Sequence, residues 1–184
     1  MNSYKVLNKH SFTSGRYSLV PIRFEDRYAI MKWRNEQIYH LRQAKPLTKE
    51  DQEAYFENVV AKLFDQEQPN QILFSFLEDG KLIGYGGLVH IEWNSKHAEI
   101  SILIDTVLNE SSYKSLVTIF FKLIEKVGFE LQLNKIYTYG YDFDGSRFEP
   151  LYKSGFILDA FLHEHVSVKD KLVPVRIYSK ILKR

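Results

Sequence analysis

The spacing of apolar residues changes twice along the chain, and this change limits the fold more than any other feature. Segments between 71 and 104 have the two-residue alternation of strands. From Leu116 to Val127 apolar residues recur every three or four positions, which is typical of a helix packed on one side. Strand alternation returns at Lys135–Tyr141. A chain that switches period in this way is predicted to fold as a mixed α/β structure.

Turn and cap signals predict the remaining elements. Asp79 and Gly80 form a tight-turn pair, and Thr48 with Asp51 three residues later forms an imperfect capping box at a helix start. The predicted elements, in chain order, are strand Tyr17–Arg23, helix Glu25–Leu41, a helix from Thr48, strands Gln71–Glu78, Lys81–Glu92 and His97–Ile104, a helix ending near Gly128, strand Lys135–Tyr141, helix Phe148–Lys153, and strands Phe156–Val168 and Leu172–Leu182. The order β-α-α-β-β-β-α-β-α-β-β predicts a mixed, largely antiparallel sheet flanked by helices.

Composition narrows the class of protein. The 184 residues contain no linker or repeat, so we expect a single domain over 1–184, with a flexible segment at 1–15. A net charge of +2 does not indicate a nucleic-acid partner. No apolar stretch approaches the ~20 residues of a membrane helix, so we expect no membrane partner and a cytoplasmic protein. Cysteine is absent, which excludes an acyl-cysteine intermediate.

Three segments are informative together: Leu82–Leu88, Ala98–Asp105, and Leu151–Phe156 followed by Leu162–His165. With the element order, these segments resemble the GNAT superfamily of acetyl-CoA-dependent N-acetyltransferases. The last is similar to the branch that holds ribosomal-protein and nucleotide-amino-sugar acetyltransferases. Trp33–Asn35 resembles the Trp-Arg-Asn of amino-sugar acetyltransferases. The resemblance implies a GNAT-like fold, acetyl-CoA as co-substrate, and transfer to a primary amine.

The resemblance also implies a cofactor site. Its predicted residues are Ile102, Leu103 and Ile104 through their backbone, and Asn109, Ser111, Ser112, Tyr113, Lys114 and Ser115 at the start of the next helix. The family's pyrophosphate loop carries two glycines that turn backbone N–H groups toward phosphate. Here Ser112 and Lys114 stand in their places, and Glu110 adds an anion. We therefore predict a degenerate pyrophosphate loop. The alternative interpretation is that Glu110 and Ser111 only cap an ordinary helix. The family often has an asparagine seven residues before the tyrosine of the Leu-Tyr segment, and the residue at that position here is Gly145.

Two residues are candidates for proton transfer. By resemblance Tyr152 is the general acid that protonates the departing thiolate, the alternative being a tyrosine that packs a short helix. Glu99 is the candidate base, on a strand face shared with Ser101; the alternative is an exposed strand glutamate.

The tripeptide Trp33, Arg34 and Asn35 is predicted to line the acceptor site. A tryptophan can stack on a sugar or base, and an arginine can hold phosphate through two hydrogen bonds. The alternative places Trp33 in a helix core with its two neighbours in solvent. His163 and His165 share a predicted strand face, but no third ligand supports a metal site, and we expect none.

The sequence thus favours direct acetyl transfer to a primary amine of a small molecule, with a nucleotide-linked amino sugar as the preferred acceptor. One alternative is a GNAT-fold protein that binds a ligand or partner without catalysis. Another is a ribosomal-protein-like N-terminal acetyltransferase. A homodimer is a further hypothesis, through pairing of Leu172–Leu182 as an edge strand.

Overall fold

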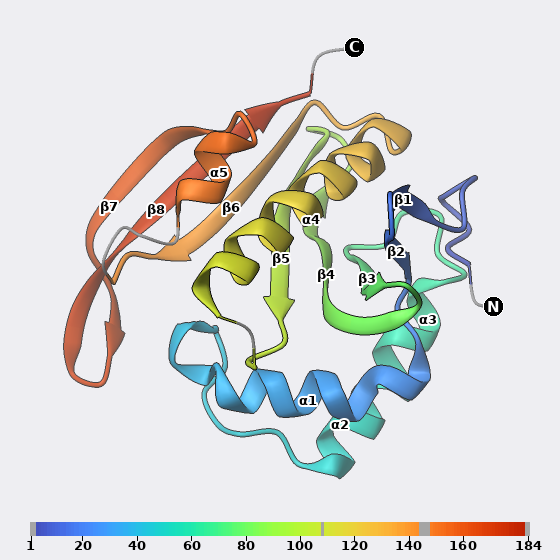
Figure 1. The fold of residues 1–184 in the computed structure, drawn as a ribbon, viewed down its shortest axis with the longest axis horizontal. Helices are drawn as coiled ribbons and strands as arrows, with labels where there is room; N and C mark the ends of the chain where they lie inside the picture. Colours follow the sequence, from blue (N-terminus) through green and yellow to red (C-terminus); the bar gives the residue numbers. More distant parts are fainter. Residues whose placement is uncertain (1–2, 108, 144–147, 183–184) are drawn as a thin grey trace.

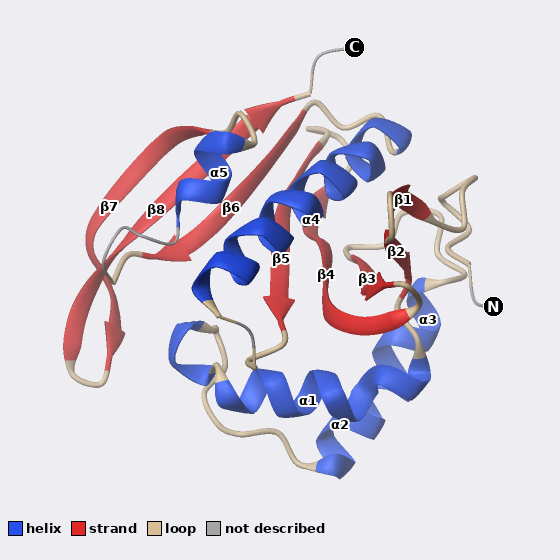
Figure 2. Ribbon diagram, in the orientation of Figure 1, coloured by secondary structure: helices blue, strands red, loops and turns tan. Residues whose placement is uncertain are grey.

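Eight strands form one sheet with helices on both of its faces (Figures 1 and 2). The computed structural model describes residues 3–107, 109–143 and 148–182. Its strands are β1 (Phe12–Ser14), β2 (Tyr17–Pro21), β3 (Ile72–Glu78), β4 (Lys81–Glu92), β5 (His97–Ile104), β6 (Lys135–Tyr141), β7 (Ile157–Val168) and β8 (Lys171–Ile181). Its helices are α1 (Arg27–Glu36), α2 (Lys49–Tyr55), α3 (Ala61–Leu63), α4 (Glu110–Glu130) and α5 (Glu149–Lys153), with 3-10 turns at Phe24–Asp26 and Ile38–His40 and a π turn at Phe56–Val60.

The strand order across the sheet is β1-β2-β3-β4-β5-β6-β8-β7. All neighbouring strands are antiparallel except β5 and β6, which are parallel and joined by the crossover helix α4. The predicted mixed, largely antiparallel sheet is confirmed. The meander β3–β4–β5 and strand β6 lie within one residue of their predicted bounds.

The two faces of the sheet carry different helices. On β4, Tyr85 points toward α1, where Arg34 donates to its hydroxyl. The next residue, Gly86, faces α4, because a Cβ placed there would meet the Phe120 ring at 2.8 Å and collide with the Ser101 carbonyl. The glycines of β4 therefore allow α4 and β5 of the same chain to approach this strand closely.

The N-terminal segment was expected to be flexible, yet its described part, from residue 3 onward, packs on the sheet. Tyr4 is 1% exposed, and its hydroxyl donates to the Leu73 carbonyl and accepts from the Leu73 N–H. Phe12, on β1, lies edge-on to Phe74 at 6.0 Å. A polar composition concealed these aromatic anchors, each of which stabilises the segment by burying apolar surface.

The predicted capping box of Thr48 and Asp51 is present. In the π turn that follows α2, Val60 is buried and Val59 is exposed. One further prediction needs correction. Strand β8 is not an edge strand: it lies between β6 and β7, because the chain reverses at Lys169 and Asp170 and returns on the inner side. The edge on this side is β7, part of the hairpin that extends from the body of the molecule in Figure 1.

Strands β5 and β6 diverge, and this split positions the site. They pair only at His97, Ala98 and Glu99, opposite Lys135–Tyr137. Beyond Glu99 the two strands move apart, as Figure 1 shows along the length of α4. The stretch Ile100–Ile104 therefore pairs with β4 on one side, and on the other side it has no strand partner among the described residues.

Candidate active site

The open edge of β5 presents main-chain groups to the split. The carbonyl of Ile104 accepts a hydrogen bond from the Gln37 side chain at 3.0 Å, so it points away from β4. N–H and C=O groups alternate in direction along a strand, which sends those of Ile102 the same way and those of Leu103 toward β4. Among the three predicted backbone contacts, the main-chain groups of Ile102 and Ile104 thus face the split, whereas those of Leu103 point toward β4.

Two cavities adjoin this edge. The β5–β6 cleft, of about 290 Å³, lies in the split and is walled by Ile100, Ile102, Tyr113, Tyr139 and Leu151 among others. The α1–α2 cavity, of about 430 Å³, lies between the sheet and helices α1 and α2, with Tyr55, Gln71 and Tyr85 in its wall. Both have Arg34 and Ser101 in their linings. Volumes of this order suit small-molecule ligands.

Glu99 is a buried carboxylate in the wall of the β5–β6 cleft. The residue is 5% exposed, so it is not the exposed strand glutamate of the simpler reading. Its Oε1 forms an ion pair with Arg42, whose guanidinium stacks over the Tyr139 ring at 4.8 Å. Its Oε2 lies 3.9 Å from Nε2 of His90 and accepts no hydrogen bond from the described residues. One carboxylate oxygen is therefore neutralised and the other can accept a proton.

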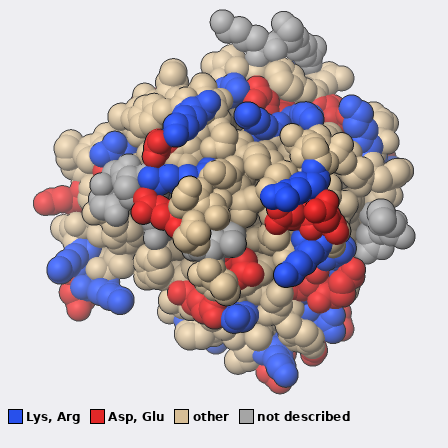
Figure 3. All heavy atoms as spheres, in the orientation of Figure 1, with Lys and Arg blue, Asp and Glu red and all other residues tan. Residues whose placement is uncertain are grey.

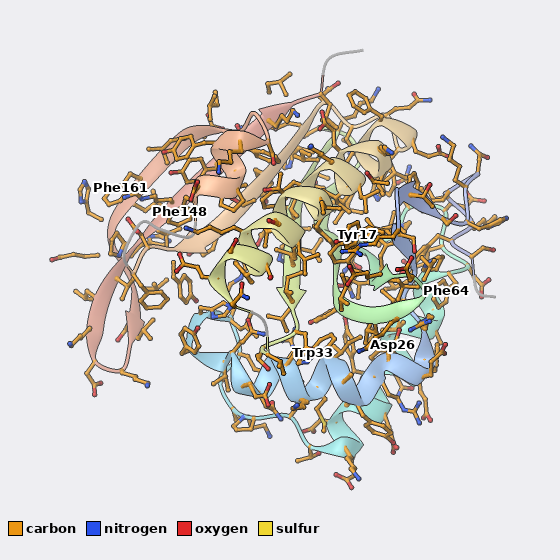
Figure 4. All side chains as sticks on the ribbon, viewed as in Figure 1. Tyr17, Asp26, Trp33, Phe64, Phe148 and Phe161 are labelled. Carbon is orange, nitrogen blue, oxygen red and sulfur yellow. The ribbon has the colours of Figure 1, made fainter. Side chains whose placement is uncertain are left out.

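The tripeptide of α1 is divided among three roles. Trp33 points into the molecule (Figure 4), is 4% exposed and lines neither cavity, so its position does not support the predicted stacking on an acceptor. The Asn35 amide exchanges two hydrogen bonds with the Leu47 backbone, at 2.8 and 2.9 Å, and so holds the chain between α1 and α2. Arg34 alone lines the cavities.

Tyr152 lies on α5 beside the cleft. Its neighbour Leu151 lines the cleft, but Tyr152 is 54% exposed and does not. The Tyr152 and Tyr178 hydroxyls are 2.6 Å apart, and Arg176 donates to Tyr178 at 3.4 Å. Burial raises the pKa of Tyr178, and the hydrogen bond with Tyr152 raises it further. The Tyr152 hydroxyl is thus part of a hydrogen-bonded group with Tyr178 and Arg176 at the side of the cleft.

Several polar groups at the start of α4 are bonded to neighbouring residues of the protein. The Asn109 side chain accepts from the Ser112 N–H at 2.9 Å, so the N-cap is Asn109 rather than Glu110 or Ser111, and the Ser112 N–H is engaged. Lys114 forms ion pairs with Glu110 at 2.9 Å and Glu149 at 3.0 Å, which raise its pKa.

Two further residues of the predicted cofactor set have different positions. The Ser115 hydroxyl donates to the Ser111 carbonyl, and the Tyr113 side chain lines the β5–β6 cleft. Gly145, where the family places asparagine, lies outside the described residues.

Sequence reasoning missed Arg42, Gln37 and Tyr85. Arg42 and Gln37 follow α1 in an irregular segment, where no periodicity marks which side chains point inward. Tyr85 stands between glycines in β4, and alternation along that strand could have placed it opposite Leu103, on the face of Glu99.

Residues 19–172 match the family model described as an acetyltransferase (GNAT) domain. The chain belongs to the GNAT acetyltransferase family. It is accordingly an N-acetyltransferase that uses acetyl-CoA as its acyl donor. No match was found among curated proteins.

Solved structures share the fold at low identity. Spermidine N-acetyltransferase from Vibrio cholerae, in complex with CoA and spermine, has a TM-score of 0.77 at 15% identity and covers 92% of this chain and 97% of its own. A probable GNAT acetyltransferase from Chromobacterium violaceum has a TM-score of 0.74 at 15% identity, covering 98% and 95%. A dodecameric form of the V. cholerae enzyme has a TM-score of 0.71 at 17% identity, covering 92% and 95%.

The apolar side chains and the main-chain groups of the β5–β6 cleft fit an acetyl-CoA donor. The open β5 edge offers N–H and C=O groups of Ile102 to the amides of a pantetheine arm, as a neighbouring strand would. At α4, the N–H groups of Glu110 and Ser111 have no acceptor among the described residues, and a 21-residue helix directs its positive dipole end there. The positive end of the α4 dipole therefore lies where the sequence predicts a pyrophosphate loop that lacks the family's glycines.

Within the described ranges, no helix is both long and apolar enough to cross a bilayer. The same ranges contain no group of three metal-ligating side chains. His163 and His165 do not converge, because Glu164 between them has a φ of 47° and interrupts the alternation of β7. Their rings contact Phe161 and Tyr139 respectively.

Proposed function

We propose that the protein transfers the acetyl group of acetyl-CoA directly to a primary amine of a small molecule, with the two adjoining cavities as donor and acceptor sites. The observation that carries this proposal is the shared wall. Arg34 and Ser101 line both the β5–β6 cleft and the α1–α2 cavity. A thioester in the first cavity and an amine in the second would meet at β5 without a covalent enzyme intermediate. The chain 1–184 then works as a single acetyltransferase domain.

Bound acetyl-CoA supplies the thioester carbonyl. Glu99 removes a proton from the incoming ammonium, directly or through one water, at its free Oε2. The amine nitrogen then forms a bond to the acetyl carbon while the carbon–sulfur bond breaks. Tyr152 gives its phenolic proton to the departing sulfur, and the new amide nitrogen releases its second proton to solvent. Tyr152 is open to solvent and regains a proton from it. The ion pair with Arg42 holds the Glu99 carboxylate in place.

The cofactor set follows the same proposal. The backbone of Ile102 and Ile104 holds the pantetheine arm, Tyr113 packs against it, and the start of α4 with Asn109, Ser111 and Ser112 faces the pyrophosphate. Lys114 contributes its charge once an anion competes with Glu110 and Glu149, and Ser115 supports the helix from behind.

Two acceptor classes have support. Likeness in fold to spermidine N-acetyltransferases supports a polyamine. The resemblance at Trp33–Asn35 supports a nucleotide-linked amino sugar. Of these three residues, Arg34 alone lines the cavities and is in position to contact such an acceptor. On the face shown in Figure 3, basic and acidic side chains alternate, and no acidic patch favours a polycation.

Thiol release from acetyl-CoA with a panel of amines tests the function. Transfer to at least one small amine, abolished by omission of either substrate, is the expected result. Calorimetric binding of acetyl-CoA without turnover of any amine or N-terminal peptide would instead support the non-catalytic alternative.

We also propose that the protein self-associates, through strand β7 and not through β8. The outer edge of β7 has no strand partner in the described part of the chain, and Ile157 there is 63% exposed. A dodecameric relative of similar fold supports association. Light scattering of the purified protein tests it. A cytoplasmic location is also proposed, on the ground that acetyl-CoA must be supplied.

A further inference from the structure

Arg34 is a half-buried cation without a counterion. Its Nε donates to Gln43 at 2.9 Å and its Nη1 to the Tyr85 hydroxyl at 2.8 Å. Both partners are neutral, and no carboxylate among the described residues lies within 4 Å of its guanidinium. A guanidinium carries five N–H groups, so three remain without an acceptor in the described part of the protein.

Two other partly buried arginines of this chain are neutralised, whereas Arg27, among the described residues, donates only to the Phe24 carbonyl and the Tyr28 hydroxyl and, unlike Arg34, lines neither cavity. Arg23 is bonded to Asp26 and Arg176 to Asp142, each at 2.6 Å. A cation withdrawn from water is costly unless paired. Gln43 and Tyr85 hold the Arg34 fork in one orientation, which prepares it to bind an anion with little further ordering.

The charges of both cavities are consistent with an anionic ligand. The α1–α2 cavity is lined by Arg34, Lys45 and a single carboxylate, Asp51. Asp51 already closes the helix cap, and hydrogen bonds from Thr48, with a smaller contribution from Lys45, lower its pKa. In the β5–β6 cleft the lining carboxylate, Glu99, is paired with Arg42. Among these linings, a polycation finds no unengaged carboxylate beyond one oxygen of Glu99.

We propose that Arg34 binds an anionic group of the acceptor, so that the substrate is an amine that also carries a phosphate or a carboxylate. This inference rests on the proposed acetyl transfer and names its substrate class. The amine would lie toward Glu99 and the anionic oxygens toward Arg34, on the face of β5 that the two cavities share. Arginine suits this role because its planar fork binds two oxygens of either group at once.

Matched acceptors test the proposal. Glucosamine 6-phosphate is compared with glucosamine, and β-alanine with β-alaninamide, each pair differing only in the anionic group; spermidine completes the set. We expect the anionic member of at least one pair to have a kcat/KM on the order of tenfold to a hundredfold higher, the worth of a charge-assisted hydrogen-bonded pair. The preferred pair distinguishes phosphate from carboxylate.

Variants assign the preference to Arg34. Arg34→Gln should remove most of the preference, measured as the ratio of kcat/KM between the anionic and the neutral member of the pair. Arg34→Lys should keep a part of it, because the charge remains without the fork. Arg27→Gln is the matched control: this half-buried arginine of the same helix contacts Phe24 and Tyr28, lines neither cavity, and should leave the preference unchanged.

A binding measurement separates this proposal from the proposed function. Calorimetry with CoA present should show binding of an anionic amine to the wild type and its loss in Arg34→Gln. If such binding occurs but no amine is acetylated, the acetyl transfer is wrong and the anion site stands. If neither anionic amine is bound or acetylated better than its neutral analogue, if spermidine is preferred, or if Arg34→Gln affects all acceptors equally, the inference is wrong.

Discussion

The two cavities that meet at β5 are built in different ways. The β5–β6 cleft owes its binding groups to main chain exposed where two parallel strands separate. The α1–α2 cavity owes its character to side chains, above all Arg34 and Tyr85. Backbone hydrogen bonds tolerate changes of side chain, so the donor site can persist while its diagnostic glycines are replaced. A site made of side chains changes its ligand with single substitutions, and there the chain's own specificity should reside.

The difference between the two cavities is tested first at Glu99, which lines the β5–β6 cleft two residues before Ser101, the β5 residue that lines both cavities. Glu99→Gln keeps the shape of the side chain but removes the base, so kcat/KM should fall roughly 100- to 10,000-fold. Acetyl-CoA affinity, measured by calorimetry, should stay within a few-fold because the β5 edge is untouched. Glu57→Gln, at an exposed glutamate of the π turn, is the control. A Glu99→Gln enzyme of normal activity would remove Glu99 as the base.

A second change tests whether α5 contributes chemistry to the backbone-built cleft. Tyr152→Phe removes the phenolic proton and should lower kcat by about 100-fold while leaving KM for acetyl-CoA similar. Tyr28→Phe, on the surface of α1, is the matched control. Unchanged turnover would show that Tyr152 only packs against Tyr178.

A smaller effect is expected at the start of α4. Glu110→Gln removes an anion from the helix end that faces the pyrophosphate and frees Lys114 from one of its two carboxylates. Acetyl-CoA binding should tighten on the order of two- to fivefold, and more at low salt. Calorimetry at two salt concentrations measures this. Weaker binding in the variant would mean that the phosphates do not approach this helix end.

The smallest effect concerns the contact between α4 and α5. Hydrogen bonds from Lys153 and Lys114 lower the pKa of Glu149 from its ordinary 4.5 to about 2. A lowered carboxylate pKa adds stability above the unfolded value, and that stability is lost as the pH falls from about 4.5 toward 2. The effect should be slight, because Glu149 is on the surface. Thermal unfolding at pH 7 and pH 3 should differ less in Glu149→Gln than in the wild type; an equal difference would contradict this.

The sequence predicted the regular parts of the molecule well, because alternation and the Asp79–Gly80 turn are local signals. It failed where burial depends on distant partners. Tyr4 is anchored by Leu73, 69 positions away, and β8 lies inside the sheet only because of the order in which the last strands return. At the site, Arg34 and Glu99 were named from the sequence, and both line the cleft. Their partners Gln43, Tyr85 and Arg42 come from other segments, and no spacing rule joins them.

The proposed acetyl transfer depends most on the β5 edge, where we propose that acetyl-CoA is held. Amide hydrogen exchange measured with and without acetyl-CoA tests this directly. The Ile102 N–H, which points into the split, should exchange fast in the free protein and become protected when acetyl-CoA binds, whereas the Leu103 N–H, which points toward β4, should be protected in both states. Binding of acetyl-CoA with no change at Ile102 would contradict the account.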